Sequence, residues 1–175
     1  TPTSYLAPRR VETERLVLRP FTPADHPAYA RITADPETMR YIGVGTPNTP
    51  DMAWRTMSSL LGHWEMLGYG IWALERKGGG LVGHVGFIDP PGWPGFELGY
   101  LLGREHWGQG YALEATRVAH RIAFEDLKKD CVISLIRPPN AASIKLARKL
   151  GAVHEGRVDL LGSEAELFVH RAGAA

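Results

Sequence analysis

The sequence predicts a single domain of the α/β or α+β layered class, in which helices pack on a central sheet. Short runs with the two-residue period of strands alternate along the chain with longer stretches that have the spacing of amphipathic helices. The length of 175 residues and the hydrophobic fraction of 44% suit one well-buried core rather than two. We therefore expect an N-terminal tail at residues 1–10 and one domain at residues 11–175.

The composition restricts the classes of partner. The formal net charge is +1 and charged residues make up 22% of the chain, so no bulk basic or acidic bias favours nucleic acid or a membrane surface. No apolar run approaches the roughly 20 residues that a membrane-spanning helix needs. With a single cysteine, the chain cannot form an intrachain disulfide framework. We expect a cytoplasmic protein with no nucleic-acid or membrane partner.

The cysteine and the histidines do not suggest a reactive or metal centre. Cys131 opens a predicted strand without an adjacent histidine, so we expect a small buried core residue rather than a nucleophile. The seven histidines are scattered without the spacing of metal ligands. We therefore expect no metal site.

The first third of the chain is predicted to contain one strand and two helices. Residues 15–19, RLVLR, form a strand, and residues 25–34 a helix with Asp25 as its N-cap. A second helix begins near residues 49–51 and ends at the glycines of residues 68–70.

A hairpin and a further strand follow in the middle of the chain. Residues 71–75 and 81–88 are β-rich and are joined by three consecutive glycines, which predicts an antiparallel hairpin. Residues 96–102 alternate, so that the side chain of Glu97 lies on the face opposite to Leu98 and Tyr100. This third strand therefore carries one carboxylate.

The last third continues the alternation of helices and strands. Residues 111–126 form an amphipathic helix with a buried stripe of small residues, and residues 132–136 form a short strand. Asn140 caps a helix that runs to Leu150. Two strands, at residues 155–161 and 166–171, complete the sheet.

Two glycines, Gly108 and Gly110, stand between the strand at 96–102 and the helix that follows it. A strand, a glycine loop and a helix N-terminus together suit an anion such as pyrophosphate, but a tight turn explains the glycines equally well. Leu113 stands where a dinucleotide fingerprint needs its third glycine, and no Walker motif occurs. Both nucleotide-binding interpretations are therefore weakened.

Several motifs in order resemble one family. The segment HWGQGYALEA, preceded by ELGY and followed by PPNAASIKLARKLGA, is similar to the acyl-CoA-binding core of the GNAT N-acetyltransferase superfamily. TERLVLRPFTPADHPAY and YGIWALERKGGGLVGHVGF resemble the first elements of its Rim branch, the ribosomal-protein N-terminal acetyltransferase type. The resemblance spans residues 11–171. It implies a mostly antiparallel central sheet with helices on both faces.

The resemblance also implies a reaction. An acetyl group would pass from acetyl-CoA to a primary amine, on a protein N-terminus or a small molecule, by direct attack in a ternary complex. The alternative is a CoA-binding sensor or scaffold without catalysis. A homodimer is possible, and the segment at residues 21–70, with Trp54 and Trp64, is expected to form the acceptor wall unless those aromatics belong to the core.

The expected cosubstrate contacts follow from the same resemblance. The pyrophosphate would lie on the backbone N–H groups of the glycine loop, with other contacts from the preceding strand and the last core helix. The first position of the family's loop pattern is Gln or Arg, but here it is Glu105, so Arg104, Lys145 and Arg148 are candidates for the phosphate cation and equally for ordinary surface residues. The expected cosubstrate-binding residues are Leu98, Tyr100, Leu102, Trp107, Gly108, Gln109, Gly110, Tyr111, Ala112, Asn140 and Ser143.

Two residues are candidates for proton transfer. Glu97 could accept a proton from the amine or only bind the amine, and water alone could also remove the proton. Ser143 could protonate the departing thiolate or only cap its helix. Asn140 could bind the pantetheine arm or serve as the N-cap.

Overall fold

The computed structural model of the protein describes residues 4–173 and contains an eight-stranded sheet in the order β1-β2-β3-β4-β5-β6-β8-β7. Neighbouring strands are antiparallel except for β5 and β6, which are parallel. The strands are β1 (Val11–Glu12), β2 (Leu16–Arg19), β3 (Ile71–Arg76), β4 (Gly80–Ile88), β5 (Glu97–Leu102), β6 (Cys131–Ile136), β7 (Val153–Leu160) and β8 (Ser163–Arg171). The helices are α1 (His26–Ala34), α2 (Pro36–Met39), α3 (Pro50–Leu67), α4 (Tyr111–Glu125) and α5 (Ala141–Lys149).

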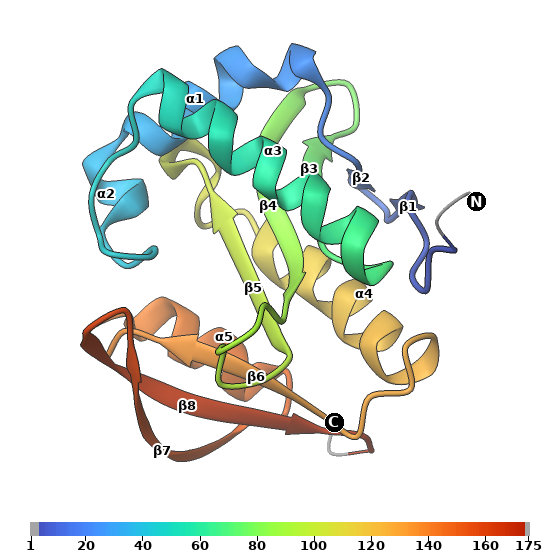
Figure 1. Ribbon diagram of the computed structural model, residues 1–175, viewed down its shortest axis with the longest axis vertical. Coiled ribbons are helices and arrows are strands. Elements are labelled where there is room, and N and C mark those ends of the chain that lie inside the picture. Colours follow the sequence, from blue (N-terminus) through green and yellow to red (C-terminus); the bar gives the residue numbers. More distant parts are fainter. Residues whose placement is uncertain (1–3, 174–175) are drawn as a thin grey trace.

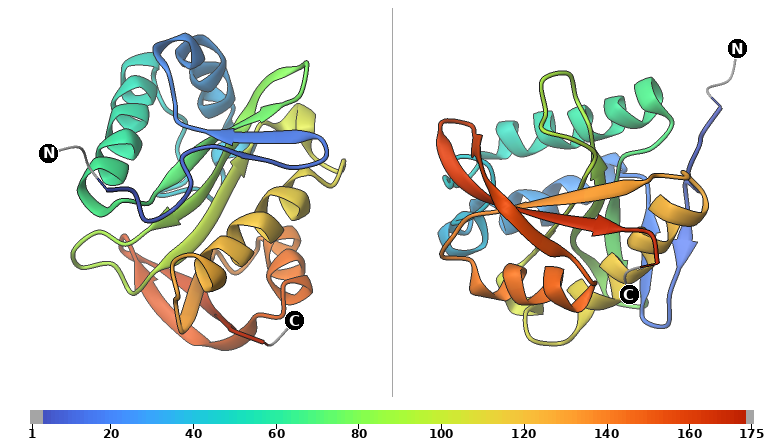
Figure 2. Two further views of the ribbon diagram at one scale, coloured as in Figure 1. Left: turned by 90° about the vertical axis from the view of Figure 1, so that its right-hand side faces the viewer. Right: turned by 90° about the horizontal axis from the view of Figure 1, so that it is seen from below.

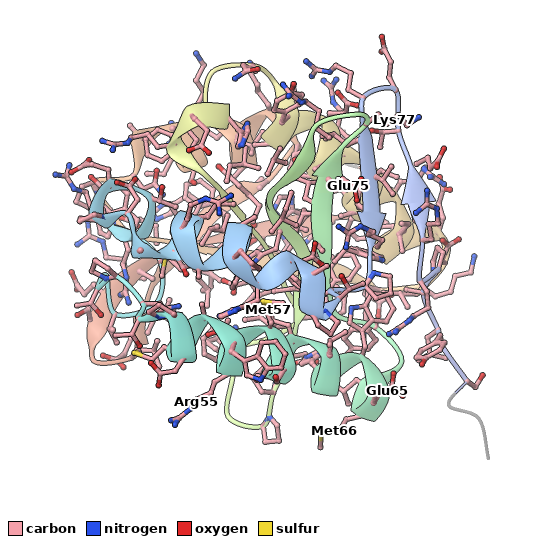
Figure 3. All side chains as sticks on the ribbon, turned by 90° about the horizontal axis from the view of Figure 1, so that it is seen from above. Arg55, Met57, Glu65, Met66, Glu75 and Lys77 are labelled. Carbon is pink, nitrogen blue, oxygen red and sulfur yellow. The ribbon has the colours of Figure 1, made fainter. Side chains whose placement is uncertain are left out.

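Helices cover both faces of this sheet (Figures 1 and 2). On one face α1 and α3 lie side by side, with Met57 of α3 pointing into the layer between them and the sheet, while Arg55 and Met66 point outward (Figure 3). On the other face, small buried residues of α4, such as Ala115 and Ala119, let this helix pack closely on β4 and β5. The predicted layered, mostly antiparallel fold is confirmed.

The predicted helices and strands all occur, with boundaries that differ by a few residues at most. The sequence interpretation missed β1 and α2, because two and four residues are too short to show a period. The start of α2 is nevertheless encoded locally, since the carboxylate of Asp35 accepts a hydrogen bond from the backbone N–H of Thr38.

The prediction that Cys131 is buried is wrong. Cys131 is exposed at the first position of β6, where it pairs with Arg171 of β8, and the neighbouring Val132 is the fully buried residue. Because successive side chains of a strand point to opposite faces, the period alone could not show which of the two enters the core.

Asp25 occupies the predicted N-cap position of α1, but its side chain makes no capping hydrogen bond to that helix. The carboxylate instead accepts two hydrogen bonds from the guanidinium of Arg19 and one from the backbone N–H of Thr22. Asp25 therefore ties β2 to the turn before α1.

Part of the expected N-terminal tail packs on the domain. Ala7 is buried, and the backbone N–H groups of Leu6 and Ala7 donate to the carbonyl of Gly68. Residues 1–3 of the expected tail and residues 174–175 of the expected domain lie outside the described residues.

Candidate active site

The two edges of β5 are paired very differently. Along its whole length β5 pairs with β4, from Glu97 opposite Ile88 to Leu102 opposite Gly83. Toward β6 it has one registered pair, Glu97 with Ile133. Beyond that pair the two strands run apart (Figure 1). The divergence creates a gap in the middle of the sheet.

Side chains bridge this gap where the backbone ladder ends. The backbone N–H of Ile133 donates to the carbonyl of Phe96, next to the one registered pair. Next, the backbone N–H of Leu135 donates to Glu97 Oε2 at 3.1 Å, and Ser134 Oγ donates to the carbonyl of Leu98 at 3.2 Å. These contacts satisfy polar groups that would otherwise lack partners where the two strands diverge.

A cavity of about 230 Å³ occupies the gap. It brings together both candidate proton-transfer residues, Glu97 and Ser143, with three of the expected cosubstrate residues, Leu98, Tyr100 and Asn140. The other lining residues are Tyr41, Ile42, Gly43, Ile71, His84, Ile88, Trp93, Gly99, Thr116, Ser134, Leu135, Ile136, Arg137, Leu146, Ala147, Leu150, Leu160 and Leu161.

Glu97 is a buried carboxyl group in this cavity, with 9% of its surface exposed. Burial raises the pKa of Glu97 to about 7, although the hydrogen bond from the Leu135 N–H lowers it. The indole of Trp93 also lowers the pKa, to a smaller extent. Its buried N–H makes no hydrogen bond of good geometry with any described residue, so this effect is minor. Glu97 can therefore exchange a proton near neutral pH.

Tyr100 and Ser143 form a hydroxyl pair. The two side-chain oxygens are 2.9 Å apart, and they join β5 to the first turn of α5. Burial raises the pKa of Tyr100, while the hydrogen bond with Ser143 lowers it. Asn140 is the N-cap of α5, because its side chain accepts a hydrogen bond from the backbone N–H of Ser143. The capping role expected for Ser143 therefore belongs to Asn140.

The glycine loop lies outside the cavity, at the start of α4. Gly108 and Gly110 have φ angles of 73° and 82°, which only glycine adopts readily. The backbone N–H groups from Gly108 to Leu113 have no hydrogen-bond partner among the described residues. Thr116, which lines the cavity, is roughly 9 Å along the helix from Gly110. The open backbone N–H groups at the start of α4 suit an anionic phosphate group.

Four of the expected cosubstrate residues lie in or around this loop. Trp107 is half exposed, and its indole N–H donates to the carbonyl of Leu102 at 2.9 Å. The side chains of Leu102 and Tyr111 are buried in the core, so they anchor the two ends of the loop to the core. The amide of Gln109 donates to the carbonyl of Glu105.

Arg15, the residue before β2, supports the loop, although the sequence interpretation did not select it. Its Nη1 donates to the carbonyl of Gln109 at 2.8 Å, and its Nε pairs with Glu114 at 2.7 Å. Its Nη2 is 3.3 Å from the position that a Cβ on Gly110 would occupy. The contact joins residues 94 positions apart in the chain, so no local pattern could reveal it.

The three cations considered from sequence lie in different surroundings. Arg104 forms an ion pair with Asp35 at 3.0 Å, and Arg148 lies over the ring of Phe168. Lys145 is exposed on α5. Arg15, by contrast, contacts the glycine loop directly through the carbonyl of Gln109.

The segment at residues 21–70 reaches the cavity, but not through its two tryptophans, and for Trp64 the core alternative holds. Trp64 is buried in the core, and Trp54 lies half exposed against His26, so neither lines the cavity. The segment contributes Tyr41, Ile42 and Gly43 instead.

Arg137 holds this part of the rim, and the sequence interpretation did not select it. Its two Nη atoms donate to four backbone carbonyls, those of Gly43, Leu160, Ser163 and Glu164. The contacts tie the segment after α2 to the β7–β8 turn.

Across residues 4–173, no cluster of His, Cys, Asp or Glu side chains could hold a metal ion. No helix in the same range is long and apolar enough to cross a membrane.

Comparisons with known proteins agree on one family. The profile of the acetyltransferase (GNAT) domain matches residues 15–153. An uncharacterized N-acetyltransferase of Bacillus licheniformis, p20, is 31% identical over 148 residues, which cover 82% of each chain. An acetyltransferase structure from Agrobacterium tumefaciens is 31% identical with a TM-score of 0.83, covering 95% of this chain and 96% of its own.

A third protein is similar in fold. The structure of Mycobacterium smegmatis RimJ in complex with CoA-disulfide has 19% identity and a TM-score of 0.72, and it covers 90% of this chain and 82% of its own.

Proposed function

The chain belongs to the GNAT family of acetyltransferases, and from this premise we propose that it moves an acetyl group from acetyl-CoA to a primary amine by direct attack in a ternary complex. One observation carries the proposal. A buried carboxyl group, Glu97, and a hydroxyl pair, Tyr100 with Ser143, line the same cavity. Positions 97 and 100 lie on opposite faces of β5, so the cavity in the gap is lined by the carboxyl group from one face and by the hydroxyl pair from the other.

The cosubstrate fits the glycine loop and the gap. The open N–H groups from Gly108 to Leu113 would hold the pyrophosphate, and the Nη2 group of Arg15, which makes no hydrogen bond among the described residues, would be a further donor beside Gly110. The gap between β5 and β6 then leads from the start of α4 toward Glu97. The side-chain amide of Asn140, whose oxygen caps α5, keeps its nitrogen available for the pantetheine arm.

Glu97 would take the proton of the amine. The nitrogen lone pair forms a bond to the thioester carbonyl carbon, and the proton leaves the nitrogen for the carboxylate directly or through water. A pKa of about 7 suits this task, because a large fraction of Glu97 is ionised at neutral pH and the acid form can still release its proton to solvent.

Tyr100 and Ser143 would return a proton to the sulfur. As the carbon–sulfur bond breaks, the thiolate accepts the proton of one hydroxyl while the second hydroxyl stabilises the oxygen left behind. A backbone N–H of β5 on its open edge would stabilise the oxyanion.

The test is the release of CoA thiol from acetyl-CoA in the presence of a panel of primary amines, together with the thermal midpoint of the protein with acetyl-CoA, CoA, ATP and NAD. We expect amine-dependent thiol release. We also expect a higher thermal midpoint with acetyl-CoA and with CoA, but not with ATP or NAD. A midpoint shift without thiol release for any amine would favour a CoA sensor. No shift with either CoA compound would refute the cosubstrate site.

A further inference from the structure

His84 lies on the side of the cavity that faces α1 and α3. It is on β4 opposite Leu101, and Glu97, Gly99 and Leu101 share this face of β5. His84 and Glu97 both line the cavity, at levels about 13 Å apart along the strand direction. The two side chains can therefore contact different parts of one substrate.

The tautomer of His84 follows from its buried neighbour Tyr29. The Tyr29 hydroxyl is 3.0 Å from His84 Nδ1, and this is its only hydrogen-bond partner among the described residues. If Nδ1 carried the proton, the hydroxyl hydrogen of Tyr29 would be buried without an acceptor. The hydroxyl therefore donates to Nδ1, and the proton of the neutral imidazole is on Nε2.

The ring remains neutral under ordinary conditions, because burial lowers the pKa of His84 to about 4. No described residue makes a hydrogen bond to Nε2. His84 thus presents a fixed N–H donor, Nε2, to the cavity. Its other nitrogen, Nδ1, is unable to act as a base because it already accepts the hydrogen bond of Tyr29.

Between His84 and Glu97 the cavity is lined by Gly99, which has no side chain; we call this surface the floor. A Cβ added at Gly99 would have only Glu97 Oε1 within 4.0 Å, and Gly99 does not have the positive φ that would require glycine. The walls on this side are mainly apolar, and they are formed by residues that include Ile71, Leu135 and Leu160.

The charges around this floor are few. Glu97 and Arg137 are the charged side chains that line the cavity, and all four Nη hydrogens of Arg137 are donated to backbone carbonyls. Arg137 is therefore not free to pair with a substrate anion through its Nη groups.

We propose that His84 is a specificity-determining residue whose Nε2–H donates a hydrogen bond to an oxygen of the acceptor. The acceptor would lie across Gly99 with its amine at Glu97, and the protein would select primary amines that carry a carbonyl or hydroxyl oxygen several bonds from the nitrogen. This inference rests on the proposed acetyl transfer.

The probes for the test are ω-amino carboxamides of increasing chain length. Each is paired with the hydrocarbon amine in which an isopropyl group, of nearly the same shape, replaces the carboxamide. At the best chain length we expect wild-type kcat/KM to favour the carboxamide at least roughly tenfold.

Two variants separate the donor role from a structural one. In His84→Asn the amide can replace Nδ1 as the acceptor for Tyr29, but it leaves no donor at the place of Nε2. In His84→Gln the longer amide can place a donor near Nε2 and lose the Tyr29 contact. We expect the carboxamide preference to fall to about one in the Asn variant and to persist in the Gln variant.

Three results would overturn the inference. The first is no carboxamide preference in the wild type at any chain length, and the second is a preference that His84→Asn keeps. The third is an equal loss of kcat/KM for both amines of a pair in His84→Asn, which would indicate that His84 acts as a base. Failure of the proposed function is distinct, because the wild type would then release no thiol with either series. The rise in thermal midpoint with acetyl-CoA checks that both variants fold and keep their cosubstrate site.

Discussion

The two edges of β5 differ in what satisfies their polar groups. On the β4 edge every residue of β5 has a registered partner, and glycines let the strands approach closely: a Cβ on Gly83 would lie within 1.9 Å of the Leu101 carbonyl oxygen. On the β6 edge one pair is followed by contacts from Glu97 and Ser134 side chains and then by a cavity.

The difference shows how one strand can be both scaffold and site. The continuous ladder with β4 fixes the position of β5, because its backbone groups are paired and buried. The missing ladder with β6 leaves room for a ligand and brings a carboxyl group into a place without bulk water. The strand therefore presents reactive groups on a rigid support.

The largest effect is expected at the open edge. Glu97→Gln keeps the shape of the side chain and can still accept from the Leu135 N–H, but it cannot take a proton. We expect kcat/KM to fall roughly 10²–10⁴-fold. The measurement is amine-dependent thiol release from pH 5 to pH 9. Wild-type kcat/KM should rise through a pKa of about 7, and the variant should lose this rise. Wild-type turnover in the variant would mean that Glu97 is not the base.

The same residue should link stability to pH. Its pKa rises from 4.5 in the unfolded chain to about 7 in the folded chain, so the unfolded state releases this proton first as the pH increases. The contribution of Glu97 to the free energy of unfolding therefore decreases between about pH 4.5 and pH 7 and is constant outside that window. The decrease is roughly 3 kcal/mol. Urea unfolding of the wild type and Glu97→Gln should show a difference that grows across this window; a constant difference would contradict the raised pKa.

A pair of glycines compares a crowded position, on the β3 side of β4, with an uncrowded one on β5. Gly86 and Gly99 are opposite each other on β4 and β5. A Cβ on Gly86 would be 2.3 Å from the Gly70 carbonyl oxygen, and its φ of 149° disfavours other residues. We expect Gly86→Ala to lower the free energy of unfolding by roughly 1–3 kcal/mol and Gly99→Ala, which meets open space, to change it by less than about 0.5 kcal/mol. Equal losses in urea unfolding would show that the cavity side of β5 at Gly99 is packed as tightly as β4 is against residues 70–71.

The smallest effect on catalysis is expected for the hydroxyl pair. Because either oxygen can pass a proton to the sulfur, Tyr100→Phe and Ser143→Ala should each lower kcat only roughly tenfold, as expected for loss of one hydrogen bond. The double variant should lose more than the sum of the two free-energy changes, since it removes both donors. Additive losses in steady-state thiol release would argue against a shared role.

Much of the fold could be predicted because its signals are local. The alternation at residues 96–102 placed Glu97 and Tyr100 on opposite faces. Thr49 is the N-cap and Gly68 the C-cap of α3, as the preferences of these residue types for helix ends predict. The two-residue period of β6 could not decide whether Cys131 or Val132 is buried. That choice depends on which face of the strand meets α4, and Cys131 is exposed.

The sequence by itself determined the order of the elements, the glycines with positive φ at the start of α4 and the polar residues available for chemistry, because each depends on neighbours a few positions away. The tertiary structure alone decided which of those residues meet. Arg15 reaches the glycine loop from just before β2, Tyr29 sets the tautomer of His84, and Leu135 restrains Glu97, each across a large separation in the chain. These contacts arise from strand order and from the divergence of β5 and β6, and no local pattern encodes either.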